Sequence, residues 1–300
     1  MAISMVLPYA NPSLLQKNFS RYKDTIDLVA MAFEKEKVFN EVPIVDYEEL
    51  LGEYINLLAQ AVDVVNILYN VRCHNEYTFK HSLNVAMLAG ALGKWLGFKG
   101  HNLKDIILAG LLHDIGKVMI PQNILDKPGK LTDEEMTIIH THPSHGYELL
   151  VDRFDTSEDV KLGILQHHER EDGSGYPCGV RGEKIHIYAK IVAIADMYDA
   201  MSTARVYRST LSPFVVVEIM LEQMHEKLNA EICSIFIANI RRFLLGSFVL
   251  LSDGDRAQVV ALNELIGSRP VVQLQNGKVI DLEKNRKIEA IAIFDKENIG

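Results

Sequence analysis

The stretch 111–117, LLHDIGK, places His113, Asp114 and Lys117 at the end of an apolar segment. A neutral imidazole and an ionised carboxylate are good ligands for a divalent transition metal. If the segment is helical, His113 and Lys117 share one face, and Asp114 points about 100° away from it. A His-Asp dipeptide alone also fits an ordinary helix end, so its meaning depends on which other residues accompany it.

Further histidines and carboxylates occur on both sides of this stretch. Each lies beside an apolar periodic run or a Gly/Pro-rich loop, which is where a buried site would be built. A lone histidine on an apolar face is more often a satisfied core residue, but an ordered series that mixes imidazole with carboxylate is hard to explain as core. These companions of His113 and Asp114 are His81, His142, His167, His168, Glu169 and Asp196.

These residues lie within a set of short motifs. The motifs are HDIGK at 113–117, IP at 120–121, ILDKPGKLT at 124–132, HPSHG at 142–146, HHEREDGSGYP at 167–177, ADMYDAM at 195–201 and RVYR at 205–208. With them the chain resembles a bacterial HD-GYP domain, a branch of the HD superfamily of metal-dependent phosphohydrolases. The resemblance covers roughly residues 75–245 and leaves both flanks uncovered.

The resemblance implies a centre of two divalent metal ions. In it Asp114 bridges the ions, His81, His113 and Asp196 hold one ion, and His142, His167 and His168 hold the other. Because these ligands mix imidazole with carboxylate, iron is the first expectation and manganese the second, whereas magnesium prefers oxygen ligands. His145 belongs to the same histidine cluster as His142, and we expect it to be a supporting or incidental residue.

Two positions depart from the family pattern. Relatives with a third metal carry a glutamate four residues before the first histidine, and this chain has Tyr77 there. Glu76 is adjacent but is rotated by about 100° on a helix. We therefore predict two ions rather than three. Val206 replaces the usual proline before Tyr207, and this change should be harmless to the chemistry.

The activity that the resemblance implies is a phosphodiesterase that hydrolyses cyclic di-GMP to linear pGpG by a metal-bridging hydroxide. Whether the product is cleaved further to GMP stays open. Asp114 and Lys117 are the expected catalytic residues, and Lys117 would also bind a phosphate oxygen. Arg205 and Arg208 match phosphate-binding positions, and arginine binds phosphate bidentately. Tyr176, in a glycine-rich loop expected to form a rigid lip over the site, either contacts guanine or shapes the loop.

Two alternatives to this activity remain. The chain could hydrolyse another cyclic or linear dinucleotide, since the loop at 175–177 does not settle which base is bound. It could also be a non-catalytic receptor for cyclic di-GMP that signals through a flanking segment. Retention of every expected metal ligand weighs against the receptor.

Composition excludes several other classes of protein. Of 300 residues, 48% are hydrophobic and 24% are charged, which is typical of a globular protein with a sizeable core. The net charge of −9 argues against binding of a nucleic acid polymer. We find no secretory signal and no apolar run of the ~18–20 residues that a membrane span needs. Three widely spaced cysteines, Cys73, Cys178 and Cys233, favour a reducing compartment, so a cytoplasmic location is expected.

The expected fold is mainly α: an HD-type helical bundle at 71–246, preceded by a small helical segment at 1–70 and followed by a small β module at 247–300. The role of the first segment is open between regulation and simple packing, and a homodimer or a signalling partner would be compatible with it. Apolar periodicity predicts helices at 78–97, 103–117, 144–152, 158–168 and 185–204, one that starts near 211, and a last one that ends near 245. Thr132 and Glu135 form a capping-box pattern that opens another helix.

After residue 246 the periodicity becomes that of short strands. Runs at 248–251, 258–262, 271–274, 279–282 and 288–294 predict a five-stranded barrel or meander. Asn276-Gly277 between two of them is a strong hairpin signal.

Overall fold

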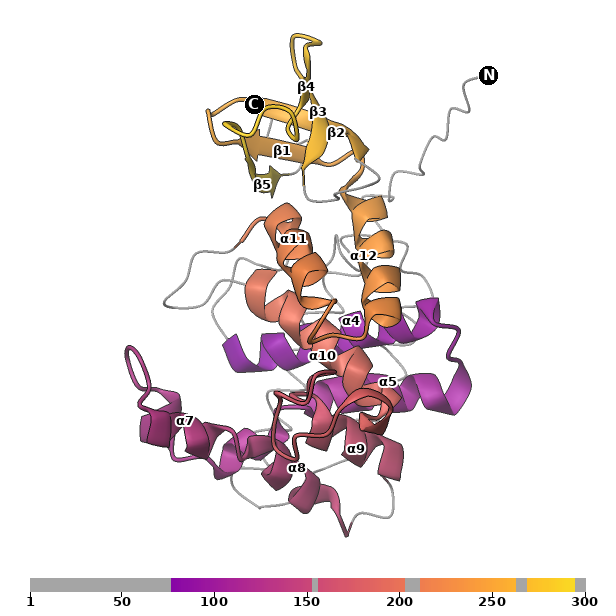
Figure 1. Cartoon of the computed structure of the whole chain (residues 1–300), viewed down its shortest axis with the longest axis vertical. Helices are drawn as coiled ribbons and strands as arrows, with labels where there is room; N and C mark the ends of the chain where they lie inside the picture. The colour runs from indigo at the N-terminus through magenta and orange to yellow at the C-terminus, as the bar shows by residue number, and fades with distance from the viewer. Residues whose placement is uncertain (1–76, 153–155, 203–210, 263–268, 295–300) are drawn as a thin grey trace.

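The computed structural model describes residues 77–152, 156–202, 211–262 and 269–294, and for residues 77–80 and 294 it describes the backbone only. The predicted segment at 1–70 and the two arginines at 205 and 208 lie outside the described residues. Helices form a stacked bundle, and a small β module lies at one end of it, next to the end of the last helix (Figure 1). None of the described helices is long and apolar enough to cross a membrane.

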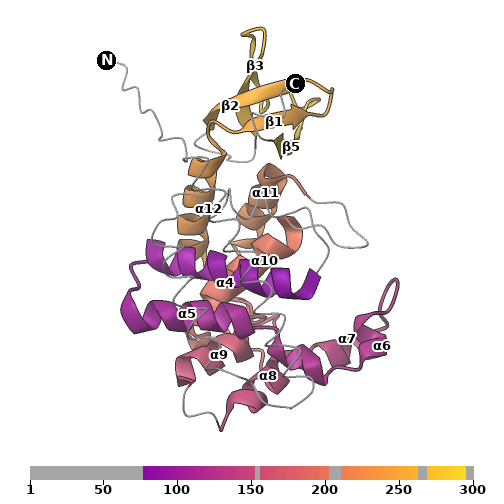
Figure 2. The same cartoon turned by 180° about the vertical axis from the view of Figure 1, so that it is seen from behind.

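The centre of the bundle is α10 (Ile187–Ser202), which packs against α4 (Tyr77–Trp95), α5 (Gly100–Leu112) and α9 (Glu158–Gln166). Helices α4 and α5 lie side by side (Figure 2). Their apolar faces are buried in one core, as the periodicity predicts. The other helical elements are η1 (Ile115–Met119), α6 (Gln122–Leu125), α7 (Asp133–Ile139), α8 (His142–Leu150), η2 (Gly182–Lys184), α11 (Pro213–Gln223) and α12 (Ala230–Leu244).

The predicted helix at 103–117 is wrong at its C-terminal end. Helix α5 ends at Leu112, and Asp114 has φ −96° and ψ 6° before the chain enters η1. The cause lies in Gly116, where an added Cβ would be 2.0 Å from the carbonyl oxygen of His142. The chain turns here because its backbone packs directly on the start of α8. Lys117 is therefore placed by η1 and not by the helical face that carries His113.

The capping-box signal in the sequence at Thr132 and Glu135 is confirmed. Thr132 caps α7 with a complete capping box, in which its side chain accepts from the Glu135 backbone and Glu135 accepts from the Thr132 backbone. That helix ends at Ile139, and α8 begins at His142 with Pro143 in its first turn. The proline fits there because its missing N–H has no partner within the helix anyway.

The C-terminal β module that the sequence predicts is present as an antiparallel sheet in which β5 pairs with β1, so it is not a simple meander. Its strands are β1 (Phe248–Leu251), β2 (Arg256–Leu262), β3 (Pro270–Leu274), β4 (Val279–Asp281) and β5 (Ala290–Phe294). Among the described residues its order is β4-β3-β2-β1-β5, and Asn276-Gly277 closes the hairpin between β3 and β4. Val249 and Leu251 of β1 belong to the same buried cluster as the helices.

Candidate metal centre

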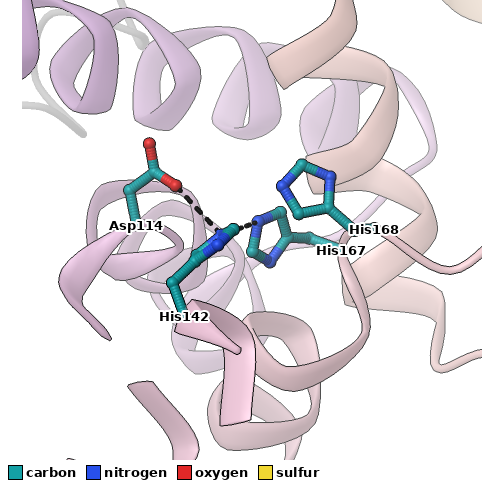
Figure 3. Close-up of side chains that lie close together, drawn as sticks. All are labelled: Asp114, His142, His167 and His168. Carbon is teal, nitrogen blue, oxygen red and sulfur yellow. Dashed lines mark hydrogen bonds and ion pairs between the residues drawn. The ribbon is translucent and has the colours of Figure 1, made fainter. Parts of the chain in front are cut away.

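The structure brings together all seven residues that the sequence predicts as metal ligands. They come from α4, the end of α5 and the turn after it, the start of α8, the end of α9, and α10. Their ligand atoms form two groups, and within each group all of these atoms lie within 4.8 Å of one another. One group is Asp114, His142, His167 and His168 (Figure 3), and the other is His81, His113 and Asp196.

The ring orientation of the buried histidines is fixed by the backbone. In His113, His142 and His167, Nδ1 lies 2.6–2.8 Å from the backbone carbonyl oxygen three residues earlier. A carbonyl oxygen only accepts, so Nδ1 carries the proton, and the lone pair of Nε2 is directed into the cluster. This is the arrangement that a metal-ligating histidine requires.

The unprotonated ligand atoms of the histidines and Asp114 lie close to one another. Nε2 of His142 lies 3.3 Å from Nε2 of His167 and 3.3 Å from Oδ1 of Asp114 (Figure 3). Nε2 of His113 is buried and makes no hydrogen bond to any described residue. Neighbouring ligands on one ion, each at about 2.1 Å, are about 3 Å apart. The donor set and its spacing therefore fit divalent cations, which would remove the repulsion between the lone pairs.

Asp114 lies between the two groups and directs one oxygen towards each. Oδ1 faces His142, while Oδ2 is 3.4 Å from Nε2 of His113 and 2.5 Å from Nζ of Lys117. Burial alone would raise the pKa of Asp114, but the Lys117 ammonium holds it well below its usual range. The carboxylate is therefore ionised at neutral pH, and its position suits the predicted bridging role.

The imidazoles of His167 and His168 lie directly after the end of α9. Burial, the largest cause, lowers the pKa of His168 to about 3 and that of His167 well below its usual range. Both rings are therefore neutral, as a ligand must be. The Tyr176 ring stacks on His140 with centroids 3.9 Å apart and lies against His168 at 4.6 Å. His145 belongs to neither group; its Nδ1 is 3.4 Å from Oε2 of Glu148.

His81 is supported by a residue to which the sequence assigned no role. Its Nδ1 lies 2.8 Å from Oδ2 of Asp199, whose Oδ1 accepts from the Asn84 amide at 2.8 Å. Burial would lower the pKa of His81, but Asp196 and Asp199 outweigh it and raise the pKa to about 10. The same negative surroundings favour a bound cation at Nε2. The available signal was spacing: Asp199 follows Asp196 by three residues, about one turn of α10.

We expect Asp199→Asn to weaken metal binding at the group of His81, His113 and Asp196. His81 and the Asn84 amide contact different oxygens of Asp199, and asparagine replaces one of these oxygens with an NH2 donor, so it cannot accept at both positions. Metal affinity at this group should fall about 10- to 100-fold, and the other group should keep its ion. Elemental analysis after dialysis against graded chelator measures this, with exposed Asp152→Asn as control. Equal metal retention in both variants would contradict the supporting role of Asp199.

Comparison with known proteins gives the family. The model of the HD domain family matches residues 66–232, more than half of the chain. The cyclic di-GMP phosphodiesterase PA4108 of Pseudomonas aeruginosa is 36% identical over 187 residues, which are 62% of this chain and 45% of that protein. The 3′3′-cGAMP-specific phosphodiesterase 1 of Vibrio cholerae is 35% identical over 199 residues, 66% of this chain and 45% of that protein. The chain thus spans less than half the length of these two relatives.

A solved structure agrees in fold. Bd1817, an HDG"Y"P protein from Bdellovibrio bacteriovorus, superposes with a TM-score of 0.62 at 18% identity, over 79% of this chain and 74% of that one. The two proteins therefore share a fold over most of this chain, including parts that lie outside the sequence motifs. The family model, which matches more than half of the chain, shows that the chain belongs to the HD domain family.

Proposed function

We propose that the chain is a metal-dependent phosphodiesterase that hydrolyses cyclic di-GMP to linear pGpG. The observation that carries the proposal is the pair of ligand groups with Asp114 between them. Relatives that are named cyclic di-GMP phosphodiesterases support the substrate. Iron is the expected metal and manganese the next, and a cytoplasmic location, a homodimer and a signalling partner remain predictions from the sequence.

Two divalent ions, when bound, would supply an activated water and neutralise the charge of a phosphodiester. The residues of the chain have separate tasks. The histidines and Asp196 would hold the ions, with Asp114 shared between them. Lys117 extends from η1 to the side of Asp114 and is half-buried, so its ammonium can also reach an oxygen of a phosphate bound there. Arg205 and Arg208 are the predicted further contacts to phosphate.

A second candidate substrate is 3′3′-cGAMP. The specific reason is the relative from Vibrio cholerae, which is as similar to this chain as the cyclic di-GMP enzyme is. The two substrates differ in one base, and the metal centre would treat their phosphodiesters alike. The non-catalytic receptor is less favoured because all seven predicted ligands lie in the two groups.

The test is turnover of cyclic di-GMP and of 3′3′-cGAMP by protein purified without oxygen, with metals quantified on the same sample. Turnover of cyclic di-GMP to pGpG with two ions per chain is the expected result. Preferential turnover of 3′3′-cGAMP would favour the second candidate. Two bound ions with binding but no turnover would favour the receptor. Three tightly bound ions would contradict the inference drawn from Tyr77.

For Lys117→Ala we expect kcat/KM to fall about 10- to 100-fold while both ions are retained, because the variant removes a charge that stabilises the phosphate. The matched control is Lys127→Ala, since Lys117 and Lys127 have the same exposure of 33% and each pairs with a carboxylate. Steady-state kinetics with metal analysis measures both variants. An unchanged kcat/KM in Lys117→Ala would remove its assigned role.

A further inference from the structure

A buried carboxylate directly after the histidine pair belongs to neither ligand group. Glu169 is 3% exposed, and its Oε1 accepts from two successive backbone amides, those of Cys178 at 2.7 Å and Gly179 at 3.1 Å. Burying a carboxyl group is costly unless hydrogen bonds compensate, and Oε1 makes two of them. Glu169 therefore anchors the loop that contains Cys178 and Gly179, which lie nine and ten residues further along the chain.

The segment between these residues folds back tightly on the histidine pair. A Cβ added at Gly175 would lie 2.4 Å from the backbone carbonyl oxygen of His168 and 2.5 Å from Cα of Glu169. The backbone amide of Tyr176 donates to the same His168 carbonyl at 3.3 Å. Only a residue without a side chain permits this approach. Two contacts thus close the loop: its first half packs on His168, and its second half is held by Glu169.

Tyr176 lies in this loop, between Gly175, which packs on His168, and Cys178, which is held by Glu169. Its ring lies against His168 at 4.6 Å with planes 32° apart, and it stacks on His140 at 3.9 Å with planes 18° apart. His168 is a member of one ligand group, so the Tyr176 ring borders the metal centre directly. No side-chain hydrogen bond of Tyr176 is among the described contacts, and the position of its ring depends on the path of the loop.

We infer that Glu169 is a positioning residue, which fixes the loop of residues 175–179 so that Tyr176 borders the centre where substrate binds. The part of the inference that concerns substrate rests on the proposed function; the part that concerns the loop does not. Glu169 acts through the length of its side chain and through Oε1 as an acceptor. Its charge and its bulk are secondary.

Three substitutions separate these properties. Glu169→Gln keeps the length and the Oε1 acceptor but removes the charge. Glu169→Asp keeps the charge but shortens the side chain by one carbon, about 1.5 Å, which takes its oxygens away from the two amides. Glu169→Met keeps the length and the apolar bulk but has no oxygen. If the methionine variant fails to fold, the comparison of glutamine with aspartate still decides the question.

The first measurement is amide hydrogen exchange over residues 170–182 of the full chain. We expect the glutamine variant to protect this segment as the wild type does, and the aspartate and methionine variants to exchange it about tenfold faster or more, because both amides lose their acceptor. Protection that is unchanged in the aspartate and methionine variants would overturn the inference, whichever dinucleotide the protein hydrolyses.

The second measurement is turnover of cyclic di-GMP together with metal content. We expect kcat/KM to fall roughly 10- to 100-fold in the aspartate and methionine variants, with both ions retained and with glutamine restoring the wild-type value. Combining Glu169→Met with Tyr176→Ala should add little to the loss from Tyr176→Ala alone, because both remove the same contact. Additive losses, or a loss in Glu169→Gln equal to that in Glu169→Met, would overturn the positioning role.

Discussion

Asp114→Ala is expected to lose metal from both ligand groups and to lose turnover by a factor of at least about a thousand. The reason is geometric. Oδ1 faces His142 and Oδ2 faces His113, so one substitution removes the carboxylate that we expect both ions to share. Asp199→Asn, by contrast, should affect only the group that contains His81. Elemental analysis and turnover, measured on the same sample, check the prediction.

The helical fold should survive this substitution. Asp114 lies in a turn between two helices and contributes no capping hydrogen bond to η1, so its loss leaves the bundle core intact. Circular dichroism verifies this. The control is Asp152→Ala, which removes an exposed aspartate. A variant at position 114 with two ions and full activity would refute the shared role of this carboxylate and with it the proposed mechanism.

Much of the fold is readable from local signals because those signals act over a few residues. The capping box at Thr132 and Glu135 forms within one helical turn, and the Asn276-Gly277 hairpin forms within one β-turn. Both predictions are confirmed. The end of α5 was mispredicted because the apolar pattern continues through Ile115, which is buried, although the helix has already ended. That end is determined by contact with α8, which no local pattern reports.

The candidate site, like the fold, could be predicted from the sequence only in part. The seven ligand candidates were found by residue type, by order and by resemblance, and the structure groups them as the resemblance implies. Spacing alone could not have given that grouping. Asp199 and Glu169 were missed as functional residues because their roles depend on contacts that fold formation creates. Asp199 reaches His81 across 118 residues, and Glu169 reaches Cys178 only because the loop turns back on itself.

Gly116→Ala is expected to be among the most damaging substitutions in the chain. Its Cβ would lie 2.0 Å from the carbonyl oxygen of His142 and 2.4 Å from the backbone nitrogen of Gly146. Both are backbone atoms of α8, so the clash cannot be relieved by a change of side-chain rotamer. We expect the metal-free protein to lose more than about 3 kcal/mol of unfolding free energy, as severe overpacking does. Urea unfolding measures the loss.

The same substitution should also empty the metal centre. Gly116 lies two residues after Asp114, and α8 begins at His142, so separating the two backbones moves a ligand of one group away from its partner. Gly93→Ala is the control, because its Cβ would meet only side-chain atoms, Cδ1 of Ile106 at 3.0 Å and Cδ1 of Leu103 at 3.2 Å foremost, and side chains can yield there. If Gly116→Ala kept both its stability and its two ions, the contact between η1 and α8 could not be what ends α5 and presents Asp114 to His142. The position of the bridging carboxylate would then need another cause.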